Sequence, residues 1–311
     1  MGKIEVAVTA WTQSSGWYAD ELCQQAEIAE SMGFHSFWLP ESHFGDNRSI
    51  PSPLTLLASV AGRTKKIILA STSYLLPIRH PLQAAEEVAV LDQLSNGRVI
   101  LGVGRGIQNR MFKAFDLQTK EKRKRFRANL DIMRNAWLGK PIAEDDDGHP
   151  ICLAPLPVQK PHPPIWVAAF GPLALKQAGS LGLPYLASPA ETLTTLEGNY
   201  KHFNDVVVEA NLEPVETTPV MRTIFITKSK SVAQDIKNSL AQSVPHAMRE
   251  ENANVDDWTI VGDKAHALDK LSEYVERLGI THLIARGRIP GVDNEAQVRS
   301  HEMLMEVAER L

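Results

Sequence analysis

The sequence has few cysteines, no long apolar run and no excess of basic residues. Only Cys23 and Cys152 could form a disulfide among 311 residues, which suits a reducing compartment. No run approaches the roughly 20 apolar residues of a membrane-spanning helix, and the N-terminal residues show no signal-peptide core. With 33 Lys and Arg against 37 Asp and Glu, the net charge is −4. We therefore expect a cytoplasmic globular protein that binds neither membranes nor nucleic acid.

Several catalytic motifs are also missing. The sequence contains no phosphate-binding loop with its lysine, no HExxH helix and no GxSxG elbow, and its histidines lack metal-ligand spacing. Gly102, Gly104 and Gly106 form a glycine-rich piece, but Ile107 stands where a dinucleotide fingerprint needs its third glycine. We expect no metal, no hydrolase triad and no Rossmann dinucleotide site.

Short apolar runs alternate with longer runs of helical period along the whole chain, which is typical of buried parallel strands joined by helices. The expected strands are Ile4–Thr9, Ser36–Leu39, Ile67–Ser73, Val99–Val103, Ile165–Ala169, Tyr185–Ser188, Val220–Thr227 and His282–Arg286. The expected helices are Asp20–Met32, Pro53–Gly62, Pro81–Leu94, Lys122–Leu138, Pro172–Leu181, Leu193–Ala210, Lys264–Leu278 and Ala296–Arg310. This count predicts an α/β protein with a (β/α)8 TIM barrel, and a doubly wound sheet stays open as the competing topology.

No linker or shift in composition divides the chain, so we predict a single domain over residues 1–311. Three segments interrupt the alternation: Gly106–Glu121, Gly139–Pro164 and Lys228–Gly262. The third follows the seventh expected strand and is long enough for an extra helix over Val232–Glu250, so we treat about 228–262 as an insertion. Loops that follow barrel strands form the catalytic face, which makes the first and third segments candidate pocket walls.

The expected strands end in small residues, arginines, one histidine and aromatic side chains. Residues at or just after these ends include Glu41, His43, Thr72, Ser73, Gly104, Arg105, Gly106, Phe170, Gly171, Arg286 and Arg288. Backbone can approach a ligand closely at glycine, and arginine binds phosphate well. The set therefore suits a flat, phosphorylated cofactor.

Longer stretches resemble the bacterial luciferase-like monooxygenase family, a flavin-using branch of the (β/α)8 barrels. The resemblance covers essentially the whole chain. It is carried by RTKKIILASTSYLLPIRHP, LDQLSNGR and GVGRG, with support from WLPESHF, PPIWVAAFGP and LGITHLIAR. It implies a homodimer that holds a flavin at the carboxyl end of the barrel and catalyses either monooxygenation or hydride transfer.

The resemblance implies roles at the third and fourth strand ends. Thr72 and Ser73 match the residues that pack against the flavin ring, often across a non-proline cis peptide. Arg105 matches an arginine near the flavin phosphate, and Gly104 and Gly106 beside it would let backbone approach the cofactor.

Further phosphate contacts follow from the same resemblance. Arg123 matches a second basic partner, and Gly171 begins a helix whose N-terminal amides would receive the phosphate. Phe170 stands where luciferases carry an acid, and it would line the cofactor site. These matches assign the phosphate to backbone and arginine rather than to side-chain hydroxyls.

The resemblance also suggests two catalytic residues. His43 matches the second histidine of the family's Glu-His-His pattern, and Ser42 replaces the first, which is the one tied to catalysis in luciferases. A carboxylate at Glu41 could hold a proton on His43 and make it a usable acid, or Glu41 could only orient its neighbour. Because Ser42 stands in place of the histidine tied to catalysis in luciferases, light-producing chemistry is not expected.

The leading hypothesis is a two-component monooxygenase that uses reduced FMN and O2 on a small organic substrate. A separate flavin reductase is then an implied partner. One alternative is the same barrel with a deazaflavin, coenzyme F-420, used for hydride transfer. The other is a flavin-binding relative without catalysis, for which Ser42 is the best support. The sequence names no substrate and fixes no dimer surface.

Overall fold

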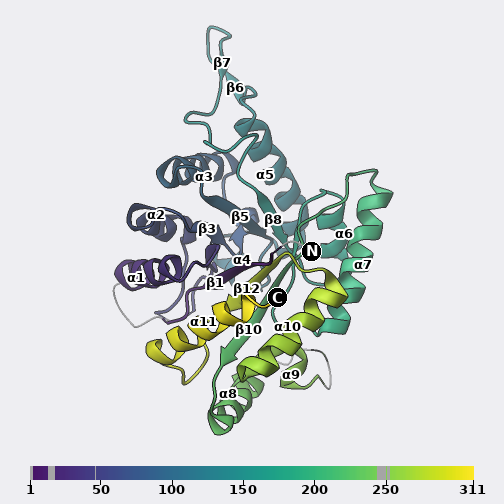
Figure 1. Ribbon diagram of the computed structural model, residues 1–311. Helices are drawn as coiled ribbons and strands as arrows, with labels where there is room; N and C mark the ends of the chain where they lie inside the picture. The colour runs from purple at the N-terminus through teal and green to yellow at the C-terminus, as the bar shows by residue number, and fades with distance from the viewer. Residues whose placement is uncertain (1–2, 13–17, 46, 244–249, 251–252) are drawn as a thin grey trace. The chain divides into compact units, whose positions relative to one another are not determined.

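The computed structural model describes residues 3–12, 18–45, 47–243, 250 and 253–311, and its strands and helices alternate along the chain (Figure 1). The chain forms two compact units. The first unit contains Met1–Ser14, Gln24–Phe37 and Val167–Leu311, and the second contains Ser15–Cys23 and Trp38–Trp166. The elements β2 (Ser36–Leu39), β8 (Ile165–Ala168) and α1 (Tyr18–Ser31) contribute to both units. The single-domain organisation stays a prediction.

The second unit is built on parallel strands. In it β3 (Ile68–Ser71) pairs with β5 (Val99–Gly104), and β4 (Tyr74–Leu75) pairs with the end of β5. The backbone N–H of Thr72 donates to the carbonyl of Leu39 over 2.8 Å, which joins the end of β3 to β2. A Cβ on Gly102 would lie 2.0 Å from the carbonyl oxygen of Ser71, so glycine at this position allows β5 and β3 to approach closely.

Helices follow the strands of the second unit along the chain. They are α2 (Pro53–Arg63), η1 (Leu76–Ile78), α3 (Pro81–Ser95), α4 (Asn109–Ala114), η2 (Thr119–Glu121) and α5 (Lys122–Trp137). Two side chains of α5 anchor it: Trp137 donates from Nε1 to the carbonyl of Ala85, and Asn129 donates from Nδ2 to the carbonyl of Leu76. The predicted irregular segment Gly106–Glu121 thus contains α4 and η2.

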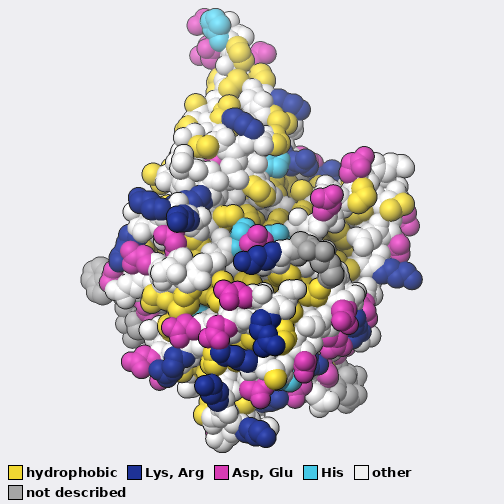
Figure 2. Space-filling model, viewed as in Figure 1, with side chains coloured by type: hydrophobic (Ala, Val, Ile, Leu, Met, Phe, Trp, Pro, Cys, Tyr) yellow, Lys and Arg dark blue, Asp and Glu magenta, His cyan; other side chains and the backbone are white. Residues whose placement is uncertain are grey.

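The proline-rich segment after α5 forms an antiparallel hairpin. Its strands β6 (Ala143–Glu144) and β7 (Pro150–Ile151) project beyond α5, with acidic side chains at the tip (Figures 1 and 2). The return from the hairpin is fastened to α3, because Gln159 donates from its backbone N–H and from Nε2 to the two carboxylate oxygens of Asp92. We therefore interpret the segment as a structural part of the second unit.

The first unit is also built on parallel strands. Strand β10 (Pro219–Ile226) lies between β12 (His282–Arg286) and β11 (Thr259–Gly262), and β12 also pairs with β1 (Glu5–Thr9). Strand β9 (Tyr185–Leu186) pairs with the end of β8. The sequence pattern predicts no strand at β11, which lies inside the expected insertion. The last residues of the insertion instead form this strand, which pairs with β10.

Helices also follow the strands in the described part of the first unit, two of them within the insertion. They are α6 (Pro172–Gly179), α7 (Leu193–Glu209), α8 (Lys230–Ser243), α9 (Val255–Trp258), α10 (Lys264–Leu278) and α11 (Asn294–Ala308). The helix expected over Val232–Glu250 begins at Lys230 and ends at Ser243, and residues 244–249 lie outside the described part. The insertion packs Ile236, Leu240 and Trp258 against Phe225 of β10. None of the described helices is long and apolar enough to cross a membrane.

Candidate functional site

A buried carboxylate lies at the carboxyl end of β2 in the second unit. The side chain of Glu41 is fully buried, and its Oε1 lies 2.6 Å from Nε2 of His43 and 2.8 Å from Nη1 of Arg79. Its Oε2 accepts a hydrogen bond of 3.0 Å from the backbone N–H of Leu75. A buried carboxylate is tolerated when such an ion pair and backbone donor surround it. Glu41 therefore fixes the imidazole of His43 in one orientation.

Arg79, which the sequence interpretation does not single out, completes this arrangement. Its guanidinium carbon lies 3.8 Å from the ring centroid of Tyr74, whose hydroxyl donates to Glu87 over 2.6 Å. Burial works to lower the pKa of Arg79, but the Glu41 carboxylate and Tyr74 raise it above its ordinary value. The only sequence signal is a charged residue placed between a buried strand and the start of α3.

His43 lies against an aromatic surface. It is 8% exposed, and its ring centroid lies 5.7 Å from that of Phe44 and 5.2 Å from that of Phe115. Phe44 is 54% exposed and Phe115 37%, so these rings present an apolar wall to solvent. Ser42, which replaces the family histidine, is engaged elsewhere, because its hydroxyl accepts from the backbone N–H of Ile50.

The third and fourth strand ends meet at Ser73 and Gly104. Thr72 and Ser73 are both half-buried, and the peptide bond between them is cis, as the family resemblance implies. A Cβ on Gly104 would lie 2.1 Å from Oγ of Ser73, so glycine at this position leaves room for the serine. The strand ends therefore offer small side chains and accessible backbone.

Replacing Gly104 by alanine should displace Ser73 and lower the free energy of unfolding by about 1–3 kcal/mol, the usual cost of overpacking. Gly62, in the last turn of α2, is the matched control, because a Cβ there meets nothing within 4 Å. Gly62→Ala should raise stability by about 0.5–1 kcal/mol. Urea denaturation of both variants checks this, and equal stabilities would contradict the role assigned to Gly104.

Three cations gather beyond the end of β5. Burial, followed by the charge of Arg123, lowers the pKa of Arg105, and burial with both arginines lowers the pKa of Lys122. Lys122 donates from Nζ to the carbonyl of Gly106 over 3.3 Å. Within the described part of the chain, no carboxylate pairs with Arg105. Concentrated positive charge of this kind suits a phosphate. Lys122 was not predicted, although it opens the basic run KRKR.

Phe170 and Gly171 lie in the first unit, directly after β8. Phe170 is 55% exposed, and Gly171 has a φ of 78° and caps α6, whose first residue is Pro172. The carbonyl of Gly171 accepts hydrogen bonds from the N–H groups of Ala174 and Leu175. The other eight predicted site residues all belong to the second unit.

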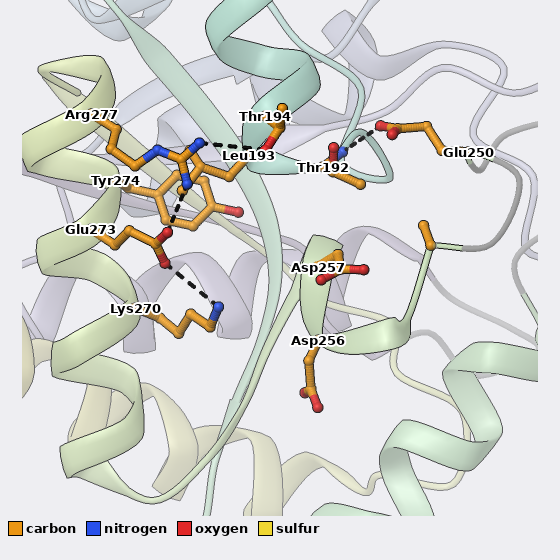
Figure 3. Close-up of a pocket in the computed structure, with 11 residues that line it drawn as sticks. Thr192, Leu193, Thr194, Glu250, Asp256, Asp257, Lys270, Glu273, Tyr274 and Arg277 are labelled. Atoms are coloured by element: carbon orange, nitrogen blue, oxygen red, sulfur yellow. Dashed lines mark hydrogen bonds and ion pairs between the residues drawn. The ribbon is translucent and has the colours of Figure 1, made fainter.

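A cavity of about 380 Å3 also occurs in the first unit, where α7, α9 and α10 meet (Figure 3). Its charged side chains already have partners: Arg277 and Lys270 both pair with Glu273, Asp256 pairs with Lys237, and Glu250 and Asp257 accept from backbone N–H groups. None of the predicted site residues lines it. The cavity therefore shares no residue with the predicted site at the strand ends.

Comparison with known proteins decides the family. The family described as luciferase-like monooxygenase matches residues 4–282. The chain belongs to the luciferase-like monooxygenase family. Its fold is accordingly the α/β (β/α)8 barrel type, and the doubly wound alternative is excluded. The first curated relatives are matched over only about half to five-eighths of their own length, 49–63%.

Three relatives indicate the range of this family. The chain is 29% identical over 233 residues, 71% of its length and 63% of the relative's, to the oxygenase component of flavin-dependent trigonelline monooxygenase from Acinetobacter baylyi. It is 27% identical over 311 residues, 88% and 90%, to an F420-dependent glucose-6-phosphate dehydrogenase from Amycolatopsis mediterranei. The oxygenating constituent of 3,6-diketocamphane monooxygenase from Pseudomonas putida, in complex with FMN, superposes with a TM-score of 0.83 at 22% identity, covering 100% and 99% of the chains.

Proposed function

We propose that this luciferase-like protein is the oxygenase of a two-component monooxygenase, which uses reduced FMN and O2 on a small organic substrate. The observation that carries the proposal is the cation cluster of Arg105, Lys122 and Arg123 beside the small-residue strand ends. Two relatives support it, one named as an oxygenase component and one crystallised with FMN. The family itself establishes only an oxidoreductase relationship.

The described residues fit FMN as a ligand. Arg105, Lys122 and Arg123 would hold the phosphate, because no carboxylate among the described residues neutralises Arg105. Thr72 and Ser73 would contact the ring, and the glycines beside them leave room for neighbouring side chains, Gly104 for Ser73 and Gly106 for Met111. Phe170 and the cap at Gly171 belong to the first unit, and their cofactor contacts stay predictions from the sequence.

Bound reduced flavin supplies the electrons that activate O2 for transfer of one oxygen atom. The residues of this chain would prepare the surroundings of that reaction. Nε2 of His43 faces Glu41, so Nδ1 is the atom that can hold or exchange a proton with the substrate. Phe44 and Phe115 would exclude water from the apolar wall beside His43. Since reduced FMN arrives from solution, a flavin reductase is the proposed partner, and a homodimer is the proposed assembly.

Replacing Arg105 by methionine should weaken FMN binding about 10- to 100-fold, because a charge-assisted bond to phosphate contributes about 1.5–3 kcal/mol. Arg127→Met is the matched control, since Arg127 lies on α5 in an exposed pair with Asp131. Fluorescence titration with FMN measures the affinity of both variants. Titration with riboflavin, which lacks the phosphate, measures the affinity without the phosphate contact. Equal FMN affinity in wild type and Arg105→Met would contradict the phosphate assignment.

Turnover tests the reaction itself. With FMN, NADH and a flavin reductase, the wild-type protein should consume O2 and a substrate from a panel of small organic compounds. Tight binding of oxidised FMN without any turnover would instead establish the flavin-binding relative without catalysis. If the protein does not bind FMN, the proposed function is wrong.

The deazaflavin alternative is favoured by one observation. The F420-dependent relative aligns over 88% of this chain, whereas the trigonelline monooxygenase component aligns over 71%. The cation cluster would equally hold the phosphate of a deazaflavin. Parallel titration with FMN and with the deazaflavin separates the two, because the preferred cofactor should bind at least tenfold more tightly.

A further inference from the structure

Arg286, at the carboxyl end of β12, finds few hydrogen-bond acceptors among the described residues. A guanidinium carries five N–H donors. The structure gives one contact from them, from Nη1 to Oγ1 of Thr223 at 3.4 Å. No carboxylate among the described residues pairs with it, and burial lowers the pKa of Arg286. Arg286 is half-buried, and a cation removed from part of its solvent without a counter-charge is unfavourable unless a ligand brings one.

Strand geometry gives the face on which this guanidinium lies. Arg222 of β10 points toward α10, because its Nε donates to the hydroxyl of Tyr274 over 2.6 Å. Successive strand residues point to opposite faces, so Thr223 points away from α10. Thr223 is directly opposite Arg286 in the pairing of β10 with β12 and contacts its side chain. Arg286 therefore lies on the face turned away from α10, and the face turned away from the outer helices lines the interior of a (β/α)8 barrel.

Arg222 shows what a structural arginine in the same sheet looks like. It is fully buried, and besides Tyr274 it donates to the carbonyls of Met221 and Glu191 at 2.8 Å each and of Ser188 at 3.4 Å. These bonds use all three of its nitrogens. Arg286 has no such set of acceptors within the described residues, so packing alone does not account for it.

We propose that Arg286 is a binding site for the carboxylate of a small organic acid. The site is argued from the first unit alone and stands independently of the proposed monooxygenase function. A single guanidinium matches a carboxylate in charge and in its two parallel hydrogen bonds. The phosphate of the cofactor is better matched by the three cations at Arg105, Lys122 and Arg123. The hydroxyl of Thr223 supplies a further donor beside Arg286.

Thermal melting tests the site without turnover. The probes are acetate, hexanoate and benzoate, each compared with its uncharged amide. At least one carboxylate should raise the melting temperature of the wild type by about 2 °C or more above its amide. Arg286→Met should lose this difference. Without probes, Arg286→Met should melt at or above the wild type, whereas Arg222→Met should melt several degrees lower.

The proposal is wrong if no carboxylate raises the melting temperature of the wild type above that of its amide. It is also wrong if the difference between carboxylate and amide persists in Arg286→Met, or if Arg286→Met without a probe melts as low as Arg222→Met. A carboxylate effect that disappears in Arg105→Met and survives in Arg286→Met would place the anion at the cofactor site and also overturn it. If FMN fails to bind while the carboxylate effect depends on Arg286, the anion site stands and the monooxygenase proposal fails.

Discussion

Glu41→Met should lower the free energy of unfolding by about 3–5 kcal/mol, because it leaves the half-buried Arg79 cation without its carboxylate. It also removes the acceptor for the backbone N–H of Leu75 and the partner of His43. Urea denaturation gives the stability, and proton exchange at His43, followed by NMR as a function of pH, reports the loss of its partner.

A double variant separates the ion pair from simple loss of packing. Glu41→Met combined with Arg79→Met removes both charges, so it should be more stable than Glu41→Met alone. Replacing Asp131, in the exposed pair with Arg127, should change stability by less than about 0.5 kcal/mol. Strictly additive losses at Glu41 and Arg79 would show that the buried pair is not coupled.

The regular elements follow closely from the sequence. The strands Ser36–Leu39 and His282–Arg286 and the helix Lys264–Leu278 have the predicted bounds, because buried apolar runs and the left-handed cap at Gly279 are local signals. Strand β11 was missed because four residues, TIVG, cannot be distinguished from a loop by period. Its pairing with β10 is a tertiary contact that local pattern does not encode.

The site residues also divide into those that local sequence signals predict and those that depend on tertiary packing. Residues next to strand ends, such as Glu41, His43 and Arg105, are found by the barrel rule. Arg79 and Lys122 are not, because they reach the site from η1 and α5 through side-chain length, which depends on how these helices pack. The missing acceptors around Arg286 are likewise visible only when every neighbouring side chain has a position.

The first unit also contains a histidine that is kept neutral by burial. His301 of α11 is 1% exposed, and its ring lies 4.8 Å from that of Trp11 and 5.6 Å from that of Phe34, centroid to centroid. The amide of Gln297 donates to its Nε2 over 2.9 Å, and its Nδ1 has no hydrogen-bond partner among the described residues. Burial lowers the pKa of His301 to about 3.

His301→Leu should flatten the dependence of stability on acid. In the unfolded chain the imidazole takes a proton below about pH 6.5, whereas in the folded protein it stays neutral down to about pH 3. The unfolded state therefore binds more protons in this window, so stability falls as pH falls, by about 2–3 kcal/mol between pH 6.5 and 4.5. Urea denaturation at both pH values should show this loss reduced in His301→Leu but not in a leucine variant of the exposed His202. His282, whose pKa burial and then His35 lower to about 4, retains part of the slope in both variants. An unchanged slope in His301→Leu would mean that His301 takes up its proton without unfolding, and burial would then not be what keeps it neutral.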